Sequence, residues 1–135
     1  MAKKIILDTN IWISTFLRKN NLRFLEFVID HELILIADDY LRNELLNVIS
    51  RRKFSSVFTA QNLIDAMEFF DSLTTFIITK KEFFGSPDVK DDFLFDLAVQ
   101  SKTKIIVSGD KKLIDFKNEK VTVISFKEFL EKFKN

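Results

Sequence analysis

The sequence contains no cysteine and only one histidine, and these two shortages exclude several kinds of active site. Without cysteine there is no disulfide framework, no thiol nucleophile and no thiolate metal site. The single histidine, His31, rules out a zinc site built from several imidazoles. His31 also has no serine or acidic partner that would support nucleophilic catalysis, so we expect it on the surface. A metal site in this chain would have to use oxygen ligands.

Glycine, proline and net charge are low as well. Two glycines and one proline in 135 residues leave few flexible connections, while 47% hydrophobic and 30% charged residues are typical of a folded domain. A chain of this length forms one sizeable core, so residues 1–135 are expected to be a single domain. The formal net charge of +1 gives no bulk basic field. A nucleic acid would therefore have to be held by a local patch or through metal ions.

Long hydrophobic runs are also missing. The first residues, MAKKIIL, begin like a signal peptide, but Asp8 and Asn10 interrupt the apolar run before an h-region can form. No later segment approaches the roughly 18 apolar residues that a membrane span needs. The sequence therefore predicts a cytoplasmic protein without a membrane partner.

Short β-rich runs alternate with helical patterns along the chain. Several runs are continuously apolar, as expected of strands covered on both faces. The expected strands are 4–7, 33–36, 75–78, 104–107 and 121–124. Helices are expected at 10–17, 22–29 and 91–100, after Asp38 or Asp39, after Thr59, and after the capping box of Ser125 and Glu128. This order predicts an α/β domain with a mostly parallel central sheet of four or five strands flanked by helices.

Two aspartates directly follow predicted strands. Asp8 follows the first strand, and Asp110 follows the strand at 104–107, after Gly109 has let the backbone turn. In open parallel sheets, ligands bind at the carboxyl ends of the strands, so the two carboxylates are candidates for convergence. Carboxylates suit Mg²⁺ or Mn²⁺, which prefer oxygen ligands and keep waters that can be activated for attack on phosphorus.

Further acids lie on two predicted helices. The segment DDFLFDLA places Asp91 and Asp92 at a helix start, where they either bind a metal or simply cap the helix. Asp96 stands between two apolar residues on a helix that otherwise reads as buried, and buried acids are rarely left without a partner or a metal. Glu44 borders an apolar helix stripe, but it could equally be a surface residue paired with a nearby arginine.

Four short motifs, in this order and spacing, resemble those of PIN-domain ribonucleases. They are ILDTN after the first strand, the glutamate of NELLNVISRRKF, the segment DDFLFDLA, and IIVSGDKKLIDF. Together they cover the chain from Ile5 to about Ile124. Within that family, the chain most resembles the branch assigned as toxins of toxin–antitoxin systems, related to virulence-associated protein C.

The resemblance implies a three-layer PIN-like fold and an Mg²⁺- or Mn²⁺-dependent endoribonuclease that acts as the toxin of a toxin–antitoxin pair. It also implies RNA as substrate, a homodimer, and a separate antitoxin protein as partner. The acidic quartet of the family falls on Asp8, Glu44, Asp91 and Asp110. By this likeness Asp8, Asp91 and Asp110 hold one or two cations, and Glu44 positions a ligand or water.

Other positions gain roles from the same resemblance. Asp91 is chosen over Asp92 because it stands seven residues before Ala98, the small helix residue that the family pattern places at that distance. Asn10 matches a polar residue of the first motif, and Ser108 matches the small hydroxyl before the last aspartate. The auxiliary or substrate-binding candidates are Asn10, Asp96 and Ser108.

Basic and aromatic residues outside the acidic motifs are candidates for binding RNA. The cations near the motifs either contact phosphates or form a solvated face. They are Arg51, Arg52, Lys53, Lys90, Lys111 and Lys112. Phe83 and Phe84, in the long loop at 80–90, could stack bases or bind a partner. Trp12 and Phe16 lie four apart on the first helix and fit either the core or a dimer contact.

Two other functions fit parts of the sequence. A haloacid-dehalogenase-like phosphatase also has an aspartate after its first strand and a late Gly-Asp pair with another acid nearby, which Asp110 and Asp115 match loosely. Such a phosphatase needs a second aspartate where this chain has Asn10. A catalytically inactive PIN-fold module that binds RNA or an antitoxin is the other alternative. Unpaired carboxylates facing one another argue against it, because they destabilise a fold unless a positive charge lies between them.

Overall fold

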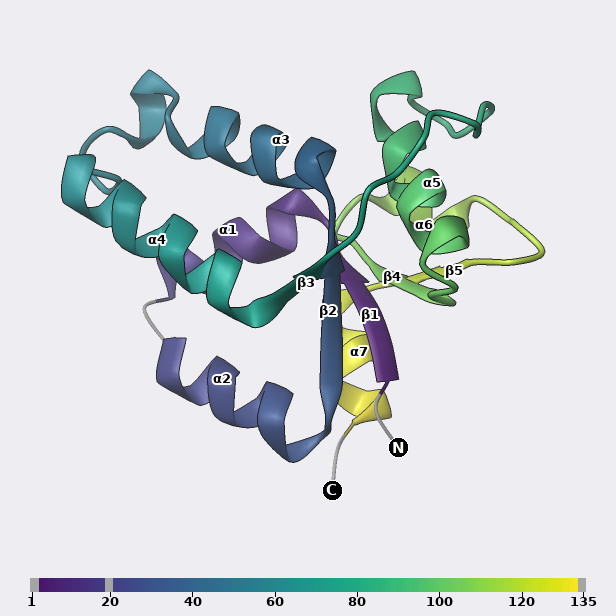
Figure 1. Ribbon diagram of the computed structural model, residues 1–135, viewed down its shortest axis with the longest axis horizontal. Coiled ribbons are helices and arrows are strands. Elements are labelled where there is room, and N and C mark those ends of the chain that lie inside the picture. Colours follow the sequence, from purple (N-terminus) through teal and green to yellow (C-terminus); the bar gives the residue numbers. More distant parts are fainter. Residues whose placement is uncertain (1–2, 19–20, 134–135) are drawn as a thin grey trace.

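The computed structural model describes residues 3–18 and 21–133, and its centre is a five-stranded sheet (Figure 1). The strands are β1 (Lys3–Leu7), β2 (Leu33–Ala37), β3 (Thr74–Phe76), β4 (Ile105–Val107) and β5 (Thr122–Ile124). All neighbouring pairs are parallel, in the order β3-β2-β1-β4-β5. The predicted α/β fold with a parallel central sheet is confirmed.

Helices connect the strands and cover both faces of the sheet. They are α1 (Thr9–Leu17), α2 (Asn21–Asp30), α3 (Asp39–Ile49), α4 (Ala60–Leu73), α5 (Asp92–Gln100), α6 (Lys111–Asp115) and α7 (Phe126–Lys132). Single 3₁₀ turns, η1 (Arg52–Phe54) and η2 (Val89–Asp91), precede α4 and α5. Figure 1 shows α1 and α4 on one side of β1 and β2, and α5 and α6 on the other, which gives three layers. Within the described ranges, no helix has the length and apolar character needed to cross a bilayer.

Aspartates that follow the strands begin several of the helices. A carboxylate at this position accepts a backbone N–H that the first helical turn leaves free. The capping aspartates are Asp8 for α1, Asp38 for α3 and Asp110 for α6. Because parallel strands end at the same edge of the sheet, these caps place three carboxylates along one edge.

The third strand is shorter than expected. It was expected at 75–78 but spans 74–76, and the side chain of Ile78 is 96% exposed. Ile77 still donates its N–H to the Ala37 carbonyl at 3.0 Å. The Thr79 hydroxyl then donates to Asp38 at 2.7 Å, which draws the chain away from the edge of the sheet and toward the start of α3.

Trp12 and Phe16 belong to the core. Trp12 is 1% exposed, and the rings of Phe24 and Phe70 meet it edge-on at 6.0 and 4.7 Å. Phe16 is buried beside it at 6.2 Å. Edge-to-face pairs of this kind add to the stabilisation that burial alone provides. Of the two readings of this pair, core packing is correct, and a dimer contact through these rings does not fit.

His31 is half-buried among aromatic rings, whereas a surface position was expected. Its ring is 4.5 Å from that of Phe27 and 5.8 Å from that of Phe133, and Nδ1 lies 3.0 Å from the Phe27 carbonyl. The cover comes from α7 at the far end of the chain, whose Phe129 also contacts Phe27 at 5.6 Å. Sequence spacing gives no sign of such a distant contact.

Candidate active site

Asp8 lies at the end of the central strand β1. Its N–H donates to the Val107 carbonyl of β4 at 2.9 Å, so the residue sits between the two strands where the order of the sheet reverses. Open α/β sheets bind ligands at such a switch point. Asp8 is 6% exposed. Its Oδ1 accepts the Thr9 N–H at 2.7 Å, and its Oδ2 accepts the Ser108 hydroxyl at 2.8 Å.

Ser108 connects Asp8 to Asp110. The buried Ser108 hydroxyl donates to Asp8 and accepts the backbone N–H of Asp110 at 3.0 Å. Asp110 in turn accepts the Lys112 N–H at 2.9 Å and begins α6. The small hydroxyl before the last aspartate therefore lies beneath the two acids and links the ends of β1 and β4.

Glu44 reaches the same place from α3. The Thr9 hydroxyl donates to Oε2 of Glu44 at 2.5 Å, while the Thr9 N–H is bonded to Asp8. One buried residue thus holds two carboxylates. Thr9 was not identified from the sequence, because the motif DTN gives no sign of a partner 35 residues away. Arg42, a possible surface partner of Glu44, pairs instead with Asp71 at 2.8 Å.

Asp91 and Asp92 face in different directions. Asp91, the last residue of η2, is 8% exposed and lines the cavity described below. Asp92 accepts hydrogen bonds from Ser86 and pairs with the Lys81 ammonium at 3.2 Å, so its carboxylate is turned toward the preceding loop. Burial raises the pKa of Asp92, but these bonds outweigh it and hold the pKa below its usual value. Asp91 is therefore the acid available to the cavity.

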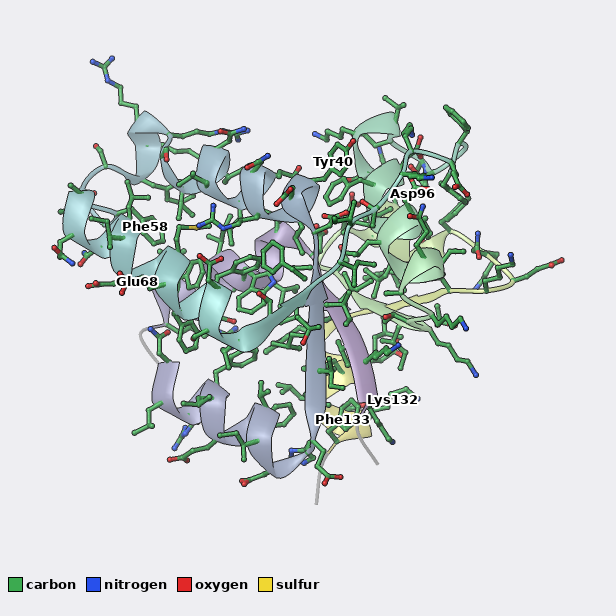
Figure 2. The ribbon with its side chains drawn as sticks, viewed as in Figure 1. Tyr40, Phe58, Glu68, Asp96, Lys132 and Phe133 are labelled. Atoms are coloured by element: carbon green, nitrogen blue, oxygen red, sulfur yellow. The ribbon has the colours of Figure 1, made fainter. Side chains whose placement is uncertain are left out.

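Asp96 fastens the same loop. Its Oδ1 accepts the N–H groups of Glu82 and Phe83 at 3.0 and 2.8 Å. One turn later, Gln100 bonds both backbone groups of Lys80. The loop is thus held by residues that recur every fourth position on α5: Asp92, Asp96 and Gln100. Figure 2 shows Asp96 on α5, and it lines a separate hollow between this loop and residues 117–120.

One cavity of about 260 Å³ collects acidic side chains at the carboxyl edge of the sheet. The carboxylates that line it are Asp8, Glu44, Asp91 and Asp110. The basic side chains that line it are Arg51, Lys53 and Lys90. Asn10 lines it too. The structure therefore brings together the four predicted acids, one auxiliary candidate and three of the six predicted cations, with Ser108 beneath.

Two acids of the cavity, Asp8 and Asp91, have raised pKa values. The pKa of Asp91 is raised to about 6, first by burial and then by the charges of neighbouring acids, Asp8 foremost. Burial also raises the pKa of Asp8, with additions from Glu44 and Asp110, although its hydrogen bonds partly oppose this. Among the described residues, none of these four acids lies within ion-pair distance of a basic side chain. Unpaired like charges in one cavity favour the binding of a cation.

The donor set fits a hard divalent cation. Carboxylate and amide oxygens, completed by water, are the ligands that Mg²⁺ and Mn²⁺ prefer. In the part of the chain that the structure describes, no three acidic or histidine side chains already stand in the geometry of a metal site. An ion would have to draw the carboxylates closer than Thr9 and Ser108 now hold them. The residues placed to respond are Asp8, Asp91 and Asp110.

The two phenylalanines of the long loop have different surroundings. Phe83 stacks on Phe95 at 4.8 Å and meets Phe116 edge-on at 6.4 Å, so it is a packing residue. Phe84 is 72% exposed, and the Lys81 ammonium lies 4.5 Å over its ring. Of the pair, Phe84 keeps the exposed surface expected of a residue that stacks a base.

The fold and the acidic cavity agree with the class of protein that the motifs resemble. A family model described as PIN domain matches residues 4–112, and the chain therefore belongs to the PIN-domain family, whose members are typically nucleases. The matched range contains all four acids of the cavity.

Individual relatives are distant. The uncharacterized protein MJ1680 of Methanocaldococcus jannaschii is 23% identical over 142 residues, covering 96% of this chain and 91% of that protein. Among solved structures, the PIN domain endonuclease Utp24 has a TM-score of 0.52 and 15% identity, over 90% of this chain and 84% of its own. For PAE2754 from Pyrobaculum aerophilum the TM-score is 0.45 and the identity 14%, over 98% and 96% of the two chains. The likeness in fold to Utp24 agrees with a PIN domain and does not distinguish its toxin branch.

Proposed function

We propose that this chain is an Mg²⁺- or Mn²⁺-dependent endoribonuclease that hydrolyses RNA phosphodiester bonds. The observation that carries the proposal is the meeting of four carboxylates from separate segments in a single cavity: Asp8, Glu44, Asp91 and Asp110. Membership of the PIN-domain family supports a nuclease in general. A nucleic acid substrate also explains why basic side chains line a cavity of acids, since they can bind phosphates while the acids hold cations.

The proposed roles follow from the surroundings of each acid. Asp8, Asp91 and Asp110 would hold one or two cations, and Glu44, fixed by Thr9, would orient the attacking water. The cation would lower the pKa of water and neutralise the charge that grows on the phosphate. Hydrolysis then adds water across one phosphorus–oxygen bond of the backbone.

Cleavage assays on metal-depleted protein test the proposal. Parent, Asp8→Asn and Asp115→Asn are compared on labelled RNA and DNA of several sequences, with and without added Mg²⁺ or Mn²⁺. We expect the parent to cut RNA only with metal, Asp8→Asn to lose at least about a hundredfold in rate, and Asp115→Asn to match the parent. Equal cleavage by parent and Asp8→Asn would remove the catalytic proposal.

The rival phosphatase has less support. Asp115 is exposed at the end of α6 and is separate from the lining of the cavity, and the position that needs a second aspartate holds Asn10. Trapping of a phosphoryl group on Asp8 would favour the phosphatase. An inactive binding module is opposed by the raised pKa of Asp91, because a cluster of acids without a cation costs stability.

We further propose a toxin role, because the sequence motifs resemble those of the toxin branch of the family. A cytoplasmic endoribonuclease toxin would act as a homodimer and be silenced by a separate antitoxin chain. Induced expression of the parent in a bacterial host should arrest growth, whereas Asp8→Asn should not. Normal growth despite soluble, RNA-cleaving parent protein would contradict the toxin role, and light scattering on purified protein decides between monomer and dimer.

A further inference from the structure

Basic side chains line the acidic cavity from two different elements. Arg51 and Lys53 come from the turn after α3, which carries η1. Lys90 comes from η2, directly before Asp91. Figure 1 shows the turn between α3 and α4 at the upper left and the start of α5 at the upper right, so the two segments approach the cavity from different directions. The cavity therefore has one basic rim on the α3 side and another on the α5 side.

The cations of both rims are available to a ligand. Arg51 and Lys53 are exposed, and neither forms an ion pair with a carboxylate of the described residues. The Lys53 ammonium lies 5.1 Å over the ring of Phe54, which keeps it beside the cavity. Lys90 pairs with Asp88 at 3.6 Å, but both side chains are largely exposed, so the pair is weak and easily exchanged for a phosphate.

The size and depth of the cavity restrict what can span the two rims. At about 260 Å³ it is smaller than the roughly 300–1,000 Å³ typical of small-molecule pockets, so an oligonucleotide must lie mostly outside it. Asp8 and Asp91 are both more than nine-tenths buried, so a phosphate has to enter the hollow to meet them. A flexible single strand can bend one phosphate inward more easily than a stacked duplex.

We propose that a single nucleic-acid strand crosses the cavity from rim to rim, with phosphates on one side of the entering phosphate bound by Arg51 and Lys53 and a phosphate on the other side bound by Lys90. The placement of the scissile phosphate in the cavity rests on the proposed nuclease function, whereas the binding of phosphates at the two rims does not. Backbone contacts of this kind give affinity and register without reading sequence. The shortest well-bound substrate is then one that carries a phosphate on each side of the scissile one.

Interference with neutral linkages tests this arrangement. Binding of a fluorescent single-stranded hexanucleotide is measured in the Asp8→Asn protein, so that no strand is cut. In that background Arg51→Gln, Lys53→Gln and Lys90→Gln are compared with Lys104→Gln, an exposed cation at the amino end of β4. Each rim change should weaken binding several-fold and lower the slope of log K against log salt by about one, and the control should do neither.

Methylphosphonate linkages then assign each rim to a side. A neutral linkage on one side of the central phosphate should weaken binding by the Asp8→Asn protein several-fold. It should change nothing further when Arg51→Gln and Lys53→Gln are combined, while Lys90→Gln remains fully sensitive to it. The opposite linkage should reverse this pattern. Rim variants that behave like Lys104→Gln, or two rims that respond to the same linkage, would overturn the inference. Cleavage by the parent is measured separately. Failure of the nuclease proposal can therefore be distinguished from failure of the rim proposal.

Discussion

At the scale of single residues, Thr9 positions two of the carboxylates that line the cavity. It is buried, its N–H is bonded to Asp8, and its hydroxyl is bonded to Glu44. Groups that orient metal-binding or catalytic side chains typically contribute about 10–100-fold to metal affinity or activity. The two carboxylates are therefore expected to depend on this one hydroxyl.

Thr9→Val should lower RNA cleavage about 10–100-fold at unchanged fold, because Glu44 loses its hydroxyl partner while the volume of the side chain is kept. Thr9→Ser should keep most of the rate. The measurements are the cleavage rate, the half-saturating metal concentration and the circular dichroism spectrum. Thr122→Val, exposed on β5, is the matched control. A Thr9→Val protein as active as the parent would show that the hydroxyl is dispensable.

Asp91 makes stability depend on pH. Its pKa is about 6 in the folded protein against 3.8 for the ordinary group, so the folded state binds the proton more tightly. The free energy of unfolding of the metal-free protein should fall as pH rises from about 4 through 6, because the unfolded chain then loses the proton first. The pKa of Asp8 is raised as well and acts in the same direction.

Asp91→Asn should therefore raise the free energy of unfolding above pH 7 by up to about 3 kcal/mol and have little effect near pH 4. Urea denaturation in EDTA at both pH values measures this. Glu68→Gln, an exposed residue of α4 labelled in Figure 2 and outside the lining of the cavity, provides the control for loss of a surface charge. A lower stability of Asp91→Asn at pH 7.5 would contradict the assigned surroundings.

At the scale of elements, the loop after β3 is organised by one face of α5. Three side chains spaced by four residues bond its backbone: Asp92, Asp96 and Gln100. Not every acid near the start of this helix therefore has to be a metal ligand. The alternative reading of Asp91 and Asp92 as helix caps is not supported, because no side-chain capping bond forms at the start of α5. Asp91 lines the cavity instead, and Asp92 and Asp96 bond the loop.

Asp96→Ala should free the loop, because two backbone N–H groups lose their acceptor, at a cost of about 1–3 kcal/mol. We expect faster hydrogen exchange at Glu82 and Phe83 and faster proteolysis within 80–88. Asp96→Asn keeps an acceptor oxygen and should behave nearly as the parent. If the main effect of Asp96→Ala were instead a weaker response of cleavage to metal, Asp96 would be an auxiliary ligand after all.

At the scale of the whole molecule, the acidic cavity links metal binding to global stability. A ligand at a hundred times its dissociation constant stabilises the state that binds it by about 2.7 kcal/mol. Saturating Mn²⁺ should therefore raise the melting temperature of the parent above its value in EDTA, and Asp8→Asn should show little of this rise. Sodium chloride at equal ionic strength controls for screening. An identical rise in both proteins would place the ion elsewhere.

Much of this architecture could be predicted from the sequence because it follows from local patterns. Apolar runs mark β1 and β4, and the parallel order alone sends Asp8 and Asp110 to one edge. The choice of Asp91 over Asp92 came instead from the resemblance to the family, whose pattern places a small residue where this chain has Ala98. Contacts between distant segments could not be predicted in this way. The bond from Thr9 to Glu44 spans 35 residues, and its formation depends on how α1 meets α3.

His31 and Phe83 both differ from expectation because distant parts of the chain cover them. His31 is covered by α7, and Phe83 is covered by rings of α5 and of the segment after α6, both brought there by the folded chain. The segment after β3 differs for the opposite reason, since the Ile78 side chain lies beyond this edge strand and is 96% exposed. Propensity describes a residue in its own segment, while burial depends on what packs over it.

Under the proposed function Asp8 and Asp110 both cap helices and hold cations, and this has a consequence for how the sequence can diverge. Asparagine begins a helix about as well as aspartate, whereas alanine does not. A lineage that abandoned catalysis could drift to asparagine at either position without loosening α1 or α6, but drift to alanine would be penalised by the fold itself. Relatives that have lost the proposed activity should therefore more often carry asparagine than alanine at these two positions.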